Sequence, residues 1–173
     1  VTLLMMRIYL IGYMGCGKST LGHRLAVETG IPFIDLDKFI EERNCKSVPR
    51  IFEEEGESGF REKERKALEE VSLFTDVIVA TGGGAPCFFD NMELMNRTGT
   101  TIFMNIDPSI LADRLLKSKT ERPLIKGKSK TDLELFIAAT LSRRLPFYRK
   151  AHFEVTQPDI APAALLKLIG VPQ

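Results

Sequence analysis

Five short apolar runs, separated by stretches with helical periodicity, are the feature that most limits how this chain can fold. The runs lie at residues 7–12, 32–37, 77–82, 100–106 and 152–156. Between them apolar residues recur at three- and four-residue steps, as Leu21 and Leu25 do within the stretch 18–29. Parallel strands need long crossover connections, and right-handed crossovers place helices on the faces of the sheet. The sequence therefore predicts an α/β fold with a mostly parallel sheet covered on both faces.

Signals at helix ends locate the later helices. The Asp-Pro-Ser sequence at 107–109 indicates a helix start, and Thr131 with Glu134 three residues later fits a capping box. We also expect helices over residues 59–75, where Glu64 falls on the repeating face, and over residues 160–169.

The length and composition of the chain favour a single domain with little net charge. The chain has 173 residues, of which 44% are hydrophobic, and 24 Lys and Arg nearly balance 23 Asp and Glu. We expect one domain over 1–173, with a core at about 7–170. The charge balance disfavours nucleic-acid and membrane partners. The apolar stretches are strand-sized and no secretion signal is evident, so we expect a cytoplasmic protein, and no apolar surface pattern argues against a monomer.

The three cysteines do not form a recognisable framework. Cys16, Cys45 and Cys87 are odd in number and have no CxxC spacing. This pattern disfavours structural disulfides and a zinc site, and we expect reduced thiols.

The strongest chemical signal is GYMGCGKST, residues 12–20, which lies between the first predicted strand and the first predicted helix. It matches the phosphate-loop pattern G-x-x-x-x-G-K-[ST]. Its glycines let backbone N–H groups surround phosphate oxygens, and the helix start adds positive charge. Lys18 would reach the terminal phosphates and Ser19 would bind Mg²⁺ directly. The predicted nucleotide-binding residues of this loop are Gly15, Cys16, Gly17, Lys18, Ser19 and Thr20. The motif alone leaves hydrolase, switch and kinase open.

Two carboxylates follow the second predicted strand. Asp35 and Asp37 alternate with apolar neighbours, so both are expected to face the ligand edge of the sheet. One interpretation is a helix cap, with Asp37 capping a helix over 38–43. The other is that one carboxylate helps to hold hydrated Mg²⁺ and the other accepts a hydroxyl proton from the phosphate acceptor.

Three further segments allow a structural and a functional interpretation. Three glycines at 82–84 follow the third strand, and successive glycines at this place indicate that some group comes close to the backbone there. Arg61, together with Arg143 or Arg144, has aromatic neighbours and could bind a carboxylate, although surface ion pairs are the commoner use of arginine. The cation-rich segment 117–130 is either a solvated loop or a lid over phosphates.

The ordered motifs resemble those of the shikimate kinases. LIGYMGCGKSTLG, DLDKFIE, IFEEEGESGFREKE, ATGGGA, ERPL and RLPFY occur in that family's order and approximate spacing, over residues 7–155. The resemblance implies a P-loop, nucleoside-monophosphate-kinase-like fold, a three-layer sandwich with a central five-stranded parallel sheet and a lid. It also implies ATP as cosubstrate, Mg²⁺ as cofactor, and phosphorylation of the 3-hydroxyl of shikimate in aromatic amino-acid synthesis.

The same resemblance suggests roles for individual residues. It implies that Asp37 binds the shikimate hydroxyls, that Arg61 and Arg144 clamp its carboxylate, and that Gly83 contacts it through the backbone. Arg122 corresponds to a lid arginine that approaches ATP. With Lys18 and Asp37, Arg122 completes the predicted catalytic set.

The sequence also bears on the second Mg²⁺ ligand and on the alternative functions. The third strand carries no acidic residue of the usual Walker B type, so Asp35, acting through water, is the expected partner of Ser19 at the metal. A protein-recognising nucleotide switch would require a base-specificity motif such as N-K-x-D, which the sequence lacks. Another small P-loop kinase, such as a gluconate or nucleotide monophosphate kinase, is the closer rival.

Overall fold

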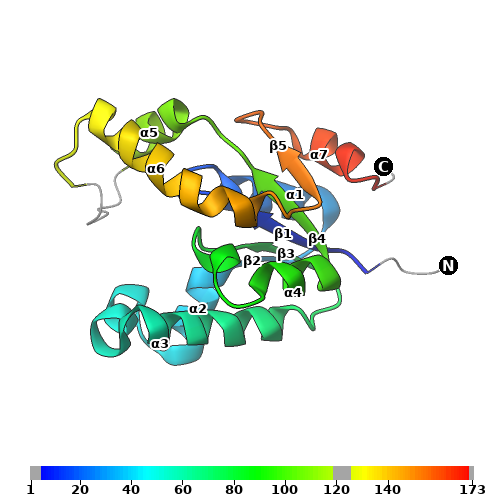
Figure 1. Cartoon of the computed structure of the whole chain (residues 1–173). Helices are drawn as coiled ribbons and strands as arrows, with labels where there is room; N and C mark the ends of the chain where they lie inside the picture. Colours follow the sequence, from blue (N-terminus) through cyan, green and yellow to red (C-terminus); the bar gives the residue numbers. More distant parts are fainter. Residues whose placement is uncertain (1–4, 119–125, 172–173) are drawn as a thin grey trace.

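A five-stranded, all-parallel sheet lies at the centre of the structure, a computed structural model that describes residues 5–118 and 126–171 (Figure 1). Its strands are β1 (Arg7–Ile11), β2 (Phe33–Asp35), β3 (Val77–Ala80), β4 (Thr100–Met104) and β5 (Phe153–Val155). They are ordered β2-β3-β1-β4-β5, and every pairing is parallel. The predicted fold is confirmed. Each strand ends before its apolar run does, because the last residues turn into the loops at the carboxyl edge.

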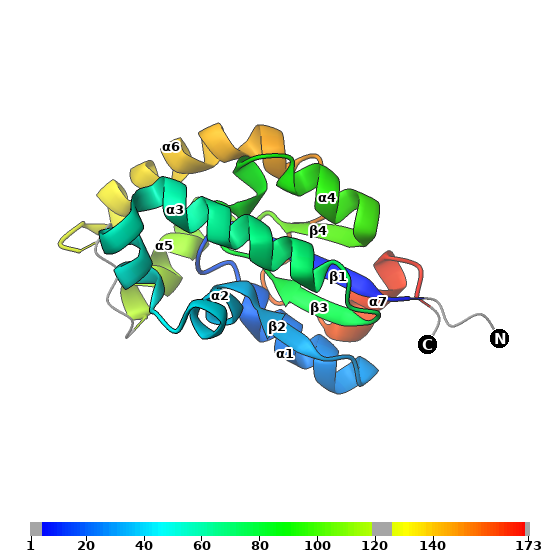
Figure 2. The same cartoon turned by 90° about the horizontal axis from the view of Figure 1, so that it is seen from below.

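Helices cover both faces of this sheet. They are α1 (Lys18–Thr29), α2 (Leu36–Asn44), α3 (Val48–Val71), α4 (Asn91–Thr98), α5 (Pro108–Lys117), α6 (Lys130–Tyr148) and α7 (Pro162–Leu168), with a short 3-10 turn η1 (Ala85–Cys87). Figures 1 and 2 show α1 and α7 on one face and α3 and α4 on the other. Residues 8–11 of β1 are fully buried between these layers, as expected for the central strand of a doubly covered sheet. In the described part of the chain, no helix combines the length and apolar character needed to cross a bilayer.

Two helix starts differ from the sequence prediction. Helix α3 begins at Val48, well before residue 59, because Ser47 caps it. The backbone of Gly56 (φ 70°, ψ −177°) is not helical, so a kink divides α3 there and its second part begins close to the predicted start. Helix α6 begins at Lys130, so the predicted capping box at Thr131 is wrong. Ser129 is the cap there: its Oγ accepts from the backbone N–H of Asp132 at 3.2 Å. Ser129 and Asp132 have the three-residue spacing predicted for Thr131 and Glu134, but they lie two positions earlier in the sequence.

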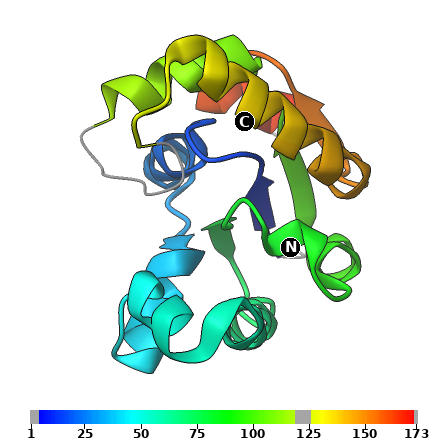
Figure 3. The ribbon, with the colours of Figure 1, turned by 60° about the vertical axis from the view of Figure 1, so that its left-hand side comes forward.

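The parallel strands bring their carboxyl ends to one edge. The loop after β1, Asp35 at the end of β2 and the glycines after β3 therefore meet there, although they are distant in sequence. In Figure 3 the loop that follows β1 lies between the pair α5–α6 and the pair α2–α3. This edge is where the predicted functional residues gather.

Candidate active site

The loop between β1 and α1 has the backbone of an anion-binding nest. Gly12, Gly15 and Gly17 all have positive φ, at 145°, 79° and 98°, which side chains of L-residues rarely tolerate. A Cβ on Gly12 would also lie 2.9 Å from the carbonyl oxygen of Met104. Helix α1 begins at Lys18 with no side-chain cap, so its first N–H groups stay available to an anion.

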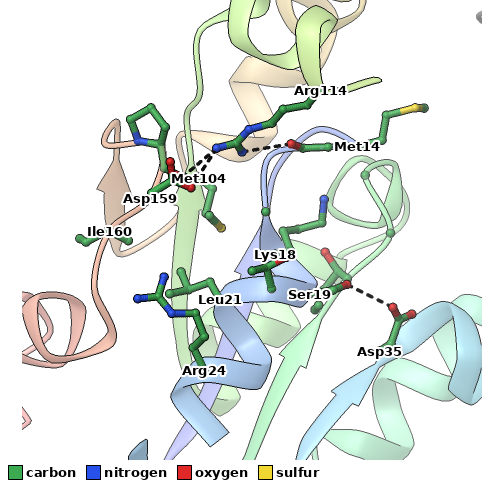
Figure 4. A pocket seen from close by; sticks show the side chains of 18 of the residues that line it. Met14, Lys18, Ser19, Leu21, Arg24, Asp35, Met104, Arg114, Asp159 and Ile160 are labelled. Atoms are coloured by element: carbon green, nitrogen blue, oxygen red, sulfur yellow. Dashed lines mark hydrogen bonds and ion pairs between the residues drawn. The ribbon is translucent and has the colours of Figure 1, made fainter. Parts of the chain in front are cut away.

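A cleft of about 560 Å³ opens above this loop (Figure 4). The predicted residues that line it are Gly15, Gly17, Lys18, Ser19, Thr20, Asp35, Asp37 and Gly83. The Lys18 ammonium donates hydrogen bonds to the carbonyl oxygens of Gly12 and Tyr13, at 2.8 and 3.0 Å. Cys16 is fully buried, with its Sγ 3.7 Å from the Lys18 Nζ, and is not among the lining residues. Its side chain therefore packs inward, and its contribution to the nest is through the backbone.

Ser19 and Asp35 form an oxygen-rich corner of the cleft. The Ser19 hydroxyl donates to Asp35 Oδ2 at 3.3 Å (Figure 4), while Asp35 Oδ1 accepts from the backbone N–H groups of Asp37 and Lys38. One carboxylate oxygen is thus used in capping α2 and the other faces Ser19. No group of three or more metal-ligating side chains occurs within residues 5–118 and 126–171. This donor set fits Mg²⁺, which in kinase sites takes one or two protein oxygens together with phosphates and water.

The helix cap falls on Asp35, so the alternative interpretation of Asp37 as a helix cap is wrong. Helix α2 begins at Leu36, directly after β2, and strand alternation therefore does not extend to Asp37. Asp37 instead lies in the first helical turn and lines the cleft. Burial raises the pKa of its carboxyl and the charge of Asp35 adds to this, against the opposing effects of Lys18 and Arg61. Asp37 is thereby a stronger proton acceptor than an ordinary aspartate.

Each glycine of the triplet after β3 faces a charged side chain. A Cβ on Gly82 would lie 3.1 Å from Asp37 Oδ1, and one on Gly83 would lie 3.0 Å from Arg144 Nη1. On Gly84 it would lie 2.9 Å from the Arg61 Cζ, inside van der Waals contact. The triplet therefore leaves space for a carboxylate and two guanidinium groups at the end of the central sheet.

Arg61 is held in a buried aromatic and acidic setting. Its side chain is only 11% exposed and forms ion pairs with Glu64 at 2.8 Å and Glu57 at 3.3 Å. The guanidinium lies over the ring of Phe88 at 4.1 Å and that of Phe60 at 5.2 Å. Arg61 is therefore not an arginine in an ordinary surface ion pair.

Arg144 is half-buried, and its guanidinium lies 5.6 Å from the centre of the Tyr13 ring. Its neighbour Arg143 is exposed. The structure thus separates the two adjacent arginines, placing Arg144 beside Gly83 and leaving Arg143 in solvent.

Glu64 is a functional candidate that the sequence analysis did not assign. It is fully buried on α3, and its Oε2 has no hydrogen-bond partner in the part of the chain that the structure describes. Burial raises its pKa from 4.5 to about 7, against the opposing charge of Arg61. The signal was a carboxylate on the apolar face of the helix, three residues after Arg61.

Arg114 of α5 was also missed. Its Nη1 donates to the carbonyl oxygen of Gly15 at 3.2 Å, and its Nη2 donates at 3.2 Å both to the carbonyl oxygen of Pro158 and to Asp159 Oδ1 (Figure 4). It thus joins the phosphate loop to the far wall of the cleft. Arg114 is one of two cations near the end of an amphipathic helix, and nothing in the sequence distinguishes it for this role. Arg122, the predicted lid arginine, lies outside the described residues.

Comparison with known proteins points to one family. The family model described as "Shikimate kinase" matches residues 14–169. A protein of Bacteroides fragilis named shikimate kinase is 56% identical over 149 residues, which cover 86% of this chain and 83% of that protein. The crystal structure of shikimate kinase from Bacteroides thetaiotaomicron has a TM-score of 0.90 at 46% identity, covering 95% and 98% of the two chains. The structure from Acinetobacter baumannii in complex with shikimate has a TM-score of 0.83 at 34% identity, covering 96% and 91%.

Proposed function

The chain belongs to the shikimate kinase family and phosphorylates the 3-hydroxyl of shikimate with ATP, and we propose how the residues of the cleft carry this out. The observation that carries the assignment is the meeting of Asp37, Arg61 and Arg144 at the glycine triplet, directly beside the phosphate loop. Two guanidinium groups at this place suit an acceptor that bears a carboxylate, as shikimate does.

On the donor side, the nest and the first turn of α1 bind the ATP phosphates. Lys18 supplies positive charge to oxygens that become more negative during transfer. The nucleoside lies toward the end of the cleft where Arg114 holds Pro158 and Asp159, since the cleft continues from the loop to these residues. We keep Arg122 as a further ATP contact, on the resemblance of the ERPL motif.

Mg²⁺ is the proposed cofactor, with Ser19 as its direct ligand and Asp35 bound through water. The facing hydroxyl and carboxylate oxygens support this assignment. When bound, the ion neutralises charge on the β- and γ-phosphates. Asp35 also holds the start of α2 in place, so it couples the metal corner to the position of Asp37.

On the acceptor side, Arg61 and Arg144 bind the carboxylate of shikimate, the Gly83 backbone contacts the ring, and Asp37 binds the hydroxyls. The raised pKa of Asp37 suits a group that accepts the hydroxyl proton. Phosphoryl transfer is largely dissociative, so orientation of the hydroxyl by Asp37 is expected to matter as much as proton removal.

The remaining proposals concern the state of the protein. We propose a single domain over the whole chain that works as a monomer in the cytoplasm, where its cosubstrate ATP is available, without nucleic-acid or membrane partners. Among the described residues the exposed large apolar side chains are spread along the chain, and no two of them lie on the same helix: Met5, Val27, Phe52, Leu73, Phe89, Leu116, Leu135 and Leu168. Light scattering coupled to gel filtration measures the oligomeric state.

A coupled ADP-release assay against shikimate, gluconate and AMP tests the acceptor. Of the three acceptors, we expect only shikimate to be phosphorylated by ATP. A higher kcat/KM with gluconate or AMP would overturn the assignment. Arg61→Ala and Arg144→Ala are expected to raise the KM for shikimate by about 30-fold or more, because each removes a desolvated charge contact of about 2 kcal/mol or more. Arg143→Ala is the matched control, since it removes the adjacent exposed arginine. Equal weakening of ATP and shikimate would place the clamp elsewhere.

A further inference from the structure

Tyr148 is a fully buried polar residue beside the cleft that has no role in the assignment above. It is the last residue of α6 and is 0% exposed. Its ring packs against Phe103 of β4, with centroids 5.0 Å apart. Its hydroxyl donates a hydrogen bond of 2.5 Å to the carbonyl oxygen of Gly83. A hydrogen bond from the core thus holds the central glycine of the triplet.

The same hydroxyl interacts with Arg144, which lies one helical turn earlier on α6. Burial raises the pKa of the Tyr148 hydroxyl, while the charge and side-chain hydrogen bonding of Arg144 lower it by less. The hydroxyl therefore stays protonated at neutral pH and can accept from the guanidinium while it donates to Gly83. Arg144 also lies against Gly83 itself, where a Cβ would be 3.0 Å from Nη1. Helix α6 contacts this glycine through two side chains.

The side of Gly83 that faces Arg144 also faces the phosphate loop. A Cβ on Gly83 would lie 3.4 Å from the carbonyl oxygen of Gly12 and 3.6 Å from the backbone nitrogen of Met14. Gly83 thus lies close to both the acceptor clamp and the loop that holds the donor. Its position affects both the direction of Arg144 and the distance between the two substrates.

We propose that Tyr148 is a positioning residue for phosphoryl transfer, whose hydroxyl fixes the Gly83 carbonyl and the Arg144 guanidinium relative to each other and to the phosphate loop. The inference rests on the proposed function, because it assigns Arg144 and Gly83 to the acceptor. Near-attack geometry is sensitive to displacements of about 1 Å, so loosening this contact is expected to affect shikimate more than ATP.

Tyr148→Phe tests the role because it keeps the buried ring and removes only the hydroxyl. The matched control is Tyr9→Phe. Tyr9 is also 0% exposed, and its hydroxyl bonds to Thr98 Oγ1 at 2.9 Å, beyond the opposite edge of the sheet. Tyr9→Phe loses the hydrogen bond to Thr98, whereas Tyr148→Phe loses the bond to Gly83 and the interaction with Arg144. We expect both variants to fold with a lower Tm.

The kinetics separate positioning from general stability. We expect Tyr148→Phe to raise the KM for shikimate about tenfold and to lower kcat several-fold, with the KM for ATP changed by less than about twofold. Tyr9→Phe is expected to keep all three constants near those of the wild type. In an Arg144→Lys background, adding Tyr148→Phe is expected to cost clearly less than tenfold in shikimate KM, because part of its effect passes through the arginine.

Two results would overturn the proposal while leaving the proposed function intact. One is a Tyr148→Phe enzyme with wild-type kcat and shikimate KM. The other is an equal loss for ATP and shikimate, which would indicate general loosening of the cleft. The proposed function would instead be refuted if the wild-type protein released no ADP when shikimate or a close analogue was supplied. Because this result comes from the wild type alone, it is distinguished from the failure of the Tyr148 proposal.

Discussion

The buried carboxyl of Glu64 is expected to make the free energy of unfolding depend measurably on pH. The carboxyl is fully buried, and its pKa is raised from 4.5 to about 7 because burial disfavours the charged form. A raised pKa means that the folded state holds a proton that the unfolded state has released. Its contribution to stability is therefore greatest below about pH 4.5 and is lost as the pH rises through about 7.

The size of this loss follows from the two pKa values. A difference between 4.5 and about 7, at about 1.4 kcal/mol for each pH unit, amounts to about 3 kcal/mol. Glu64→Gln stays neutral at every pH and keeps the shape of the side chain. Between about pH 5 and about pH 9 we expect the wild type to lose about 2 to 3 kcal/mol of unfolding free energy relative to this variant.

Urea unfolding of both proteins across this range measures the difference. Glu57→Gln is the matched control, because Glu57 pairs with the same guanidinium but its side chain is 60% exposed. We expect the stability of that variant to follow the wild type, since an exposed carboxylate remains hydrated. A difference between Glu64→Gln and the wild type that does not change with pH would show that Glu64 ionises in the folded state as it does in water, and the reasoning from burial would be refuted.

Three further substitutions test the assigned roles. Lys18→Met is expected to abolish phosphoryl transfer while the circular dichroism spectrum is unchanged, because the Lys18 ammonium bonds to carbonyl oxygens of the loop. Asp37→Asn is expected to lower kcat by about a hundredfold or more in steady-state assays with little change in the KM for ATP; a wild-type kcat would move the acceptor site elsewhere. Gly84→Ala is expected to raise the KM for shikimate, because its Cβ would lie 2.9 Å from the Arg61 Cζ and the guanidinium must move; unchanged shikimate binding by calorimetry would contradict this.

Local patterns predicted the features that neighbouring residues determine. The phosphate loop and helix α1 have the expected bounds, since Gly17 and Lys18 mark the helix start directly in the sequence. The roles of Asp35 and Asp37 could not be separated in this way. They depend on whether β2 continues for one more residue or α2 begins at Leu36, and both residues satisfy the preferences of a cap.

Long-range contacts explain what the sequence left open. Arg114 and Gly15 are 99 positions apart and Tyr148 and Gly83 are 65 apart, so nothing in the local pattern marks either pair. The glycine triplet shows the same limit from the other side. Its composition predicts that something approaches the backbone, but not that Gly82 faces Asp37, Gly83 faces Arg144 and Gly84 faces Arg61. Three successive residues without side chains therefore accommodate one anionic and two cationic groups, brought from three helices to the carboxyl end of a single strand.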